Sequence, residues 1–433
     1  MAPRFTVRPE PPEPIKLFPR SFPMHMQVSE VPASSVTTAP APAPAKSPSK
    51  RYFHLDALKG VMILWGIPVH ASTVGTSAFF DKVAEISGWV RMEAFFIISG
   101  FLSYMLIKRY GAKPIMKRRL TAVGIPLLSV LVLLNPLTNY LILKYHNAAT
   151  APSFPDFMMG RIPEGMHGTW NWHLHIWFLG VLLCLAAIFS TTAMRWMDAT
   201  VDFLRPKLRK LPDGILLLTA ACVVGGAALT ARVGYEAAVK PFVSESFHFP
   251  LRAIGYYAGF YCFGMLMFAS PRLLATFHRF NWIQIVASAL LLWGAQTIQP
   301  QLPNKVGEVV RLLAEVYFAL MFATVLFASF EKFFSKPTPV MKFIAESAFT
   351  VYLFHYLAIY LCAFAIRPYV GDQFTLGLLV TLTTTVVTML GYEFFICRSP
   401  VFRALFLGKF SKQPEPTKES GAPQAVASVQ SGS

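Results

Sequence analysis

The stretch HLDALKGVMILWGIPVH, residues 54–70, places a lysine and a histidine in an otherwise apolar helical segment. Lys59 and His70 are eleven residues apart, so on a helix they lie within about 20° of one face and about 16 Å apart. An imidazole titrates near neutral pH and suits a general base, whereas an ammonium group suits an anionic ligand. Pro68 removes a helical hydrogen bond one turn before His70, which predicts a kink. The plainer alternative is that Lys59 reaches the membrane surface and His70 bonds a neighbouring helix.

Other apolar segments also carry ionisable side chains. Arg91 and Glu93 are two residues apart, so they point about 200° away from each other and each needs its own polar partner. A charge at the centre of a membrane span costs about 2.5–3.5 kcal/mol on insertion scales, so such residues indicate a functional site. Further polar or amphipathic side chains in these segments are His173, His175, Trp177, Arg252, Tyr256, Arg311, Glu315, Tyr352 and His355.

Two of these groupings have simpler explanations. Arg311 and Glu315 are four residues apart, which favours an ion pair along one helix. His173 and His175 are two residues apart, a spacing unsuited to a helical metal pair, and we expect no metal.

The composition identifies the environment that these residues occupy. The 433 residues are 54% hydrophobic and 14% charged, whereas about a quarter of the residues of soluble domains are charged. The sequence therefore predicts an all-α, polytopic integral membrane protein with about ten transmembrane helices. The expected spans are 55–75, 83–107, 120–143, 173–193, 214–231, 250–270, 281–298, 308–329, 343–366 and 374–396.

The basic residues indicate the orientation of the spans. The net charge of +17 is concentrated in short loops such as 108–119 and 194–213, without the aromatic-interleaved basic patch of a nucleic-acid-binding protein. By the positive-inside rule both termini are cytoplasmic. Residues 1–50 are rich in Pro, Ala and Ser and, like 411–433, are predicted to be disordered cytoplasmic tails around a membrane domain at 51–410.

This orientation groups the ionisable residues by depth. Lys59 and the loop 108–119 would form a cationic inner rim suited to a phosphate-bearing ligand. A polar cavity opening outward is expected between mid-membrane and the outer face. Its expected members are His70, Glu93, His175, Arg252, Arg311 and His355.

Five motifs carry a resemblance to a known family. LDALKGVMILWGIPVH, FFIISGFLSYML, RRLTAVGIP, HIWFL and SAFTVYLFHYL, in this order, resemble the membrane acyltransferase-three family over about residues 51–410. The resemblance implies a ten-helix enzyme that O-acylates extracytoplasmic carbohydrates. WGIPVH, SYML, VGIP and RSPVFRALFLGK are most similar to members associated with succinylation of osmoregulated periplasmic glucans at the Gram-negative inner membrane.

The chain departs from the family pattern at two positions. The family has an arginine where this chain has Lys59, which keeps the charge but loses the planar fork of a guanidinium. The family also has a pair of arginines three apart at the start of the third span. Here Arg119 matches the first and Ala122 replaces the second.

The resulting hypothesis is O-succinyl transfer to a periplasmic glucan. His70 would be the general base, and Glu93 or His355 would orient it or stabilise its charge. Lys59 and Arg119 would hold the donor substrate, succinyl-CoA, and no cofactor is expected. The other candidate substrate-binding residues are Arg91, His175, Trp177 and Arg252. No Ser or Cys lies in a nucleophile motif, which favours direct attack by the acceptor hydroxyl.

The expected partners are membrane lipid, the acyl-CoA donor and the glucan acceptor, with other glucan-biosynthesis proteins as further candidates. One alternative is acetylation of another surface polysaccharide by the same fold. A second is a secondary transporter of a dicarboxylate or a sugar, although we see neither an internal repeat nor paired broken helices.

Overall fold

The computed structural model describes residues 52–164, 166, 171–191 and 193–410. These residues form helices and connecting segments, and no strand occurs among them, which confirms the all-α prediction. Large apolar side chains face outward, as at Val132, Ile283 and Trp293, which are 70%, 82% and 68% exposed. Such an apolar exterior suits hydrocarbon rather than water. The predicted tails, 1–50 and 411–433, lie outside the described residues.

Ten helices of 15 residues or more form the main part of the described region, and nine of them are apolar on average. These nine are α1 (Phe53–Ala71), α2 (Ala78–Tyr110), α7 (Trp177–Thr191), α9 (Asp213–Ala238), α10 (Glu245–Ala269), α12 (Trp282–Ile298), α13 (Asn304–Phe334), α14 (Pro339–Ile366) and α15 (Gln373–Gly391). The amphipathic helix α8 (Ala193–Lys210) follows α7.

The shorter elements extend or connect these helices. One continuous path is built from α3 (Ala112–Arg119), α4 (Ile125–Ser129) and α5 (Asn135–His146), joined by π-helical turns at Leu120–Gly124 and Val130–Leu134. A third π-helical turn, Tyr392–Ile396, extends α15. The remaining short helices are α6 (Phe154–Met158), α11 (Pro271–Phe277) and α16 (Pro400–Leu407).

Six of the helical segments in the described part are long and apolar enough to cross a membrane. The count becomes seven if α10 and α11, which are bent by 113° at Ser270, form one span. The apolar helix at Leu174–Ser190 is shorter. The protein is therefore an integral membrane protein, and the number ten stays a prediction.

Local sequence signals explain where the helices begin and end. Ser77 precedes α2 and its side chain accepts a hydrogen bond from Phe80 N, and Asp372 does the same for α15 by accepting from Thr375 N at 2.7 Å. α2 ends at Gly111, whose φ of 85° is readily adopted by glycine. α1 continues past Pro68 as far as Ala71.

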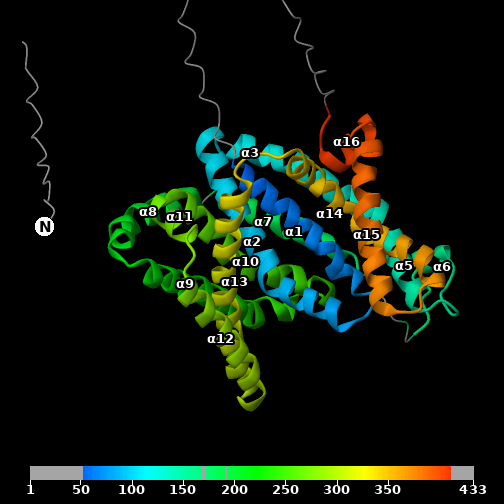
Figure 1. Cartoon of the computed structure of the whole chain (residues 1–433), viewed down its shortest axis with the longest axis horizontal. Helices are drawn as coiled ribbons and strands as arrows, with labels where there is room; N and C mark the ends of the chain where they lie inside the picture. Colours follow the sequence, from blue (N-terminus) through cyan, green and yellow to red (C-terminus); the bar gives the residue numbers. More distant parts are fainter. Residues whose placement is uncertain (1–51, 165, 167–170, 192, 411–433) are drawn as a thin grey trace, which may run out of the picture. The chain divides into compact units, whose positions relative to one another are not determined.

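Helix α1 lies in the middle of the described bundle and contacts α2, α13, α14 and α15 (Figure 1). α2 in turn packs along α10. The two backbones meet at Gly100 and Gly264, because a Cβ at Gly100 would collide with the carbonyl of Tyr261 and one at Gly264 with that of Ile97. Small residues allow this close approach of helices in a membrane protein.

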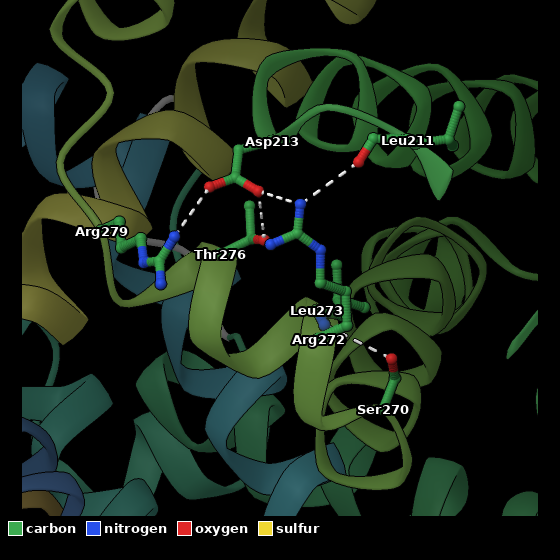
Figure 2. Close-up of polar contacts among 7 residues, drawn as sticks. All are labelled: Leu211, Asp213, Ser270, Arg272, Leu273, Thr276 and Arg279. Atoms are coloured by element: carbon green, nitrogen blue, oxygen red, sulfur yellow. Dashed lines mark hydrogen bonds and ion pairs between the residues drawn. The ribbon is translucent and has the colours of Figure 1, made fainter. Parts of the chain in front are cut away.

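An ion-pair cluster holds the bent helix α11 against the start of α9 (Figure 2). Asp213, the first residue of α9, pairs with Arg272 and, at 3.3 Å, with Arg279. Thr276 Oγ1 donates to the same carboxylate at 3.2 Å, and Arg272 also donates to the carbonyl of Leu211 at 3.2 Å. The cluster therefore fixes the chain reversal after α10.

Candidate active site

Three histidines from distant parts of the sequence lie together among the described helices. His70 comes from the last turn of α1, His175 from the 3₁₀ turn that precedes α7, and His355 from the middle of α14. The ring centroid of His70 is 5.2 Å from that of His355 and 6.3 Å from that of His175. His175 and His355 are 4.9 Å apart by the same measure. The helix contacts of α1 with α14 thus bring the predicted residues into one cluster.

The three histidines line a small cavity of about 70 Å³, which we call the histidine cavity. Arg91 of α2 and Trp177 of α7 also line it. The complete lining is Ile63, His70, Arg91, Met92, Phe95, His175, Trp177, Phe178, Tyr352 and His355. Five residues that the sequence singled out as site candidates are therefore neighbours.

Hydrogen bonds assign the tautomer of His355. Its Nδ1 lies 2.8 Å from the carbonyl oxygen of Tyr352 and 3.1 Å from that of Val351, so Nδ1 carries the proton and Nε2 the lone pair. Nε2 is buried and has no hydrogen-bond partner among the described residues. His355 therefore presents an acceptor nitrogen to the cavity. A buried acceptor without a hydrogen bond lowers the stability of the folded protein, so a ligand that donates to it is favoured.

The other polar members of the cavity also have unused hydrogen-bonding capacity. Both ring nitrogens of His175 and Nε of Arg91 are buried without a partner in the described region. The hydroxyl of Tyr352 donates to the carbonyl oxygen of His175 at 2.7 Å and so fixes the turn that carries this histidine. Gly66 makes room for Arg91, because a Cβ at that position would collide with the guanidinium.

Glu93 does not line the histidine cavity. It lies two residues after Arg91, on the opposite side of α2, and lines a second cavity of about 290 Å³. The angular separation expected for residues two apart on a helix explains this division. The residues expected to line a single outward cavity are thus divided between two cavities.

We call the second one the charged cavity. It receives ionisable side chains from α2, α9, α10 and α13. Its lining is Gly88, Glu93, Ala228, Arg232, Phe249, Arg252, Ala253, Tyr256, Tyr257, Arg311, Leu312 and Glu315.

Most charges in the charged cavity are paired. Arg232 bonds Glu308, and Arg311 Nε lies 3.7 Å from Glu315 Oε1, which confirms the ion pair predicted for the latter two residues. Arg252 forms no ion pair or hydrogen bond within the described residues. Arg252 is therefore the one arginine of the charged cavity without an ion-pair partner among the described residues.

An aromatic wall separates the two cavities. Trp177, which lines the histidine cavity, stacks on Tyr257, which lines the charged cavity, with centroids 5.8 Å apart and planes at 24°. Phe249 packs edge-on against the same tryptophan at 5.0 Å. The sequence pattern does not single out Tyr257 or Phe249, because neither position interrupts an apolar segment with a charge.

The candidate donor residues lie away from both cavities. Lys59 pairs with Asp56 at 2.9 Å near the start of α1. Arg119, at the end of α3, donates to Ser103 Oγ, which also accepts from Tyr261 OH at 2.6 Å. Arg119 is thus anchored against α2 and α10. Ser103 and Tyr261 carried no signal in the sequence analysis, since a lone hydroxyl in an apolar helix is common.

The three histidines raise the question of a metal ion. Among the described residues, no group of three or more His, Cys, Asp or Glu side chains is arranged to hold one. An oriented imidazole, a second imidazole beside it and a guanidinium that can stabilise negative charge are groups that can take part in acid–base chemistry.

Comparison with known proteins identifies relatives of the chain. Glucans biosynthesis protein C of Escherichia coli O81 (strain ED1a) and that of E. coli K12 are each 27% identical to the chain over 390 residues, covering 84% of the chain and 96% of the relative. The protein of the same name from E. coli O157:H7 is 26% identical over the same length. No solved structure matches the chain. A family model described as an acyltransferase domain matches residues 52–393, and the chain therefore belongs to the membrane acyltransferase-three family.

Proposed function

We propose that this membrane acyltransferase transfers a succinyl group from succinyl-CoA to a hydroxyl of a periplasmic glucan. Family membership supports acyl transfer, and the similarity to proteins named for glucan biosynthesis supports the acceptor. The observation that carries the proposal is the histidine cavity, where His70 and His355 adjoin each other and Arg91. A site of this kind can remove a proton from a hydroxyl and stabilise the oxyanion that follows.

His70 is the proposed general base. No hydrogen bond engages its ring within the described part of the chain, so a nitrogen is available to the acceptor hydroxyl. The hydroxyl oxygen attacks the thioester carbonyl while His70 takes its proton. The C–S bond then breaks, and the imidazolium returns the proton to the leaving thiolate of CoA. His355, with its acceptor Nε2, orients His70 and supports its positive charge.

Arg91 is proposed to stabilise the negative charge on the thioester oxygen. Its Nε lacks a partner among the described residues. The guanidinium packs against Gly66, at a position that a Cβ would occupy. A hydrogen-bond donor that is already in place needs no reorganisation during the reaction. His175 and Trp177 also line the histidine cavity, and we propose that the acyl group packs against them.

The donor is proposed to bind at the cytoplasmic face of an inner-membrane protein whose two termini are cytoplasmic. Lys59 lies eleven residues before His70 on α1, so the phosphate-bearing part of CoA would bind about 16 Å from the reacting centre. Arg119 and the exposed Lys117 and Arg118 extend this basic surface.

The test is the composition of periplasmic glucans from strains with and without this gene. Succinyl groups add both mass and negative charge, whereas acetyl groups add mass alone, so mass spectrometry with anion-exchange chromatography separates the two. The proposal expects succinylated glucan only when the gene is present. Glucans of unchanged mass and charge in the deletion strain would exclude glucan as the acceptor, and a loss of acetyl groups alone would exclude succinyl-CoA as the donor.

A further inference from the structure

We propose that the charged cavity is a sugar-binding subsite, which holds a glycosyl unit of the acceptor next to the unit that is acylated. The inference rests on the proposed function for the identity of the acceptor. It assigns Glu93 and Arg252 to acceptor binding and leaves the proton transfer to the histidine cavity.

Glu93 supplies the first argument. The residue is 2% exposed, and Oε1 accepts from Tyr256 OH at 3.3 Å while Oε2 has no partner in the described residues. A buried carboxylate oxygen without a hydrogen bond is destabilising, and its chemistry calls for a donor. The oxygen belongs to a side chain that lines the cavity, so a ligand hydroxyl can supply that donor.

Arg252 supplies the complementary group. Its side chain is exposed at the same cavity and has no ion-pair partner in the described part of the chain, whereas Arg232 and Arg311 are already paired. The ligand must therefore donate to a carboxylate and accept from a guanidinium. A sugar hydroxyl does both without carrying charge. An ionised carboxylate would satisfy Arg252 but carries no hydrogen-bond donor for Oε2 of Glu93.

The size and apolar surface of the cavity fit one sugar ring. Its volume of about 290 Å³ is just below the range of about 300–1,000 Å³ for small-molecule sites. Tyr257 and Phe249 add flat apolar faces to the charged lining. A pyranose ring, with a C–H face and a rim of hydroxyls, matches this combination of aromatic and polar groups.

The subsite and the reacting centre share the aromatic wall. Trp177 and Tyr257 stack on each other, and each lines one of the two cavities. The two cavities are thus adjacent, and in this proposal one unit of a glucan presents a hydroxyl to His70 while its neighbour binds in the charged cavity. A single glucose would fill only one of the two positions, so a disaccharide should bind more tightly than glucose.

Measurement of sugar binding to the purified protein tests the proposed subsite independently of acyl transfer. Purified full-length protein in detergent micelles is titrated with glucose and with a gluco-disaccharide, and tryptophan fluorescence or calorimetry reports the affinity. We expect Glu93→Leu and Arg252→Gln each to weaken disaccharide binding about ten- to a hundredfold, the range for hydrogen bonds to charged groups. Arg252 is exposed, so its variant remains informative if the buried Glu93 variant does not fold.

The control is Lys305→Gln, which removes an exposed charge from α13 outside both cavities and should bind the disaccharide like the unmodified protein. Equal affinity of the Arg252 variant and the unmodified protein for the disaccharide would overturn the inference, as would succinate that binds more tightly than the disaccharide and displaces it. Glucan succinylation that persists alongside such a result would leave the proposed function standing. Tight disaccharide binding without any acyl transfer would instead uphold the subsite and reject the proposed function.

Discussion

The ring of His70 lies 5.2 Å from that of His355, centroid to centroid, although the two residues belong to the first and the fourteenth helix. The hydrogen bonds of His355 Nδ1 to the carbonyl oxygens of Val351 and Tyr352 leave Nε2 as the only acceptor of that ring. An imidazole of fixed tautomer beside a second imidazole fits the proposed division of roles, in which His70 transfers the proton and His355 orients it.

Replacing His70 with Ala should lower succinyl transfer about 10²- to 10⁴-fold, the usual contribution of a general base. His355→Ala should also lower it, and the double variant should be no slower than His70→Ala, because residues that act as a unit are non-additive. Succinyl content of the glucan is measured by mass spectrometry, with the protein level in membranes determined by immunoblot.

His278→Ala is the matched control, since this histidine lines neither the histidine cavity nor the charged cavity. Transfer at the unmodified rate in the His70 variant would remove His70 from the mechanism.

Gly66→Ala tests the position of Arg91. The added methyl group would occupy the space of the guanidinium, so we expect Arg91 to move and kcat to fall by about tenfold or more, because small displacements in an active site are costly. The KM for succinyl-CoA should change much less, since the proposed site for the donor phosphates lies near Lys59, away from Gly66. Steady-state kinetics with purified enzyme separates the two parameters.

Gly226→Ala, on α9, adds the same methyl group where no atom lies within 4 Å, and it should leave kcat unaltered. A Gly66 variant with full kcat would show that Arg91 needs no fixed position.

Sequence reasoning predicted much of the fold because bilayer thickness limits the length of an apolar helix. The expected spans 83–107 and 308–329 lie within α2 and α13, respectively. The bend between α10 and α11 was not predicted, because it depends on the contacts of Arg272 and Arg279 with Asp213. These charges looked like ordinary loop residues in the sequence.

The candidate site was predicted in part for the same physical reason. His70, His175 and His355 are costly in lipid, so their convergence in one cavity could be expected. The helical period also separates Arg91 from Glu93, but it does not reveal which of the two faces the histidines. That choice depends on the rotation of α2 against α1 and α10, which tertiary packing at Gly100 and its neighbours determines.

Lys59→Ala tests the donor site. Loss of the ammonium group should raise the KM for succinyl-CoA several-fold with little change in kcat, and added salt should reduce the difference from the unmodified enzyme. The Lys59→Arg variant should bind succinyl-CoA at least as tightly as the unmodified enzyme, because a guanidinium contacts phosphate through two N–H groups. The measurement is KM at low and high ionic strength.

Lys82→Ala is a close control for this variant. Lys82 pairs with Glu85 three residues away, as Lys59 does with Asp56, but it lies in the first turns of α2. A parallel rise of KM in both variants would mean that the effect is one of general surface charge rather than of a donor site near Lys59.

Gly264→Ala tests the packing of α10 against α2. A methyl group there would collide with the carbonyl of Ile97 and approach Phe101 N to 2.9 Å, so the helices must separate, at a cost of about 1–3 kcal/mol typical of overpacking. Thermal unfolding in detergent should show a lower midpoint. Gly294→Ala, on α12, meets no atom within 4 Å and should not be destabilised, because alanine favours a helix over glycine by about 1 kcal/mol. Equal midpoints for both variants would contradict the backbone contact, because Gly264, unlike Gly294, faces another helix at a distance that excludes a side chain.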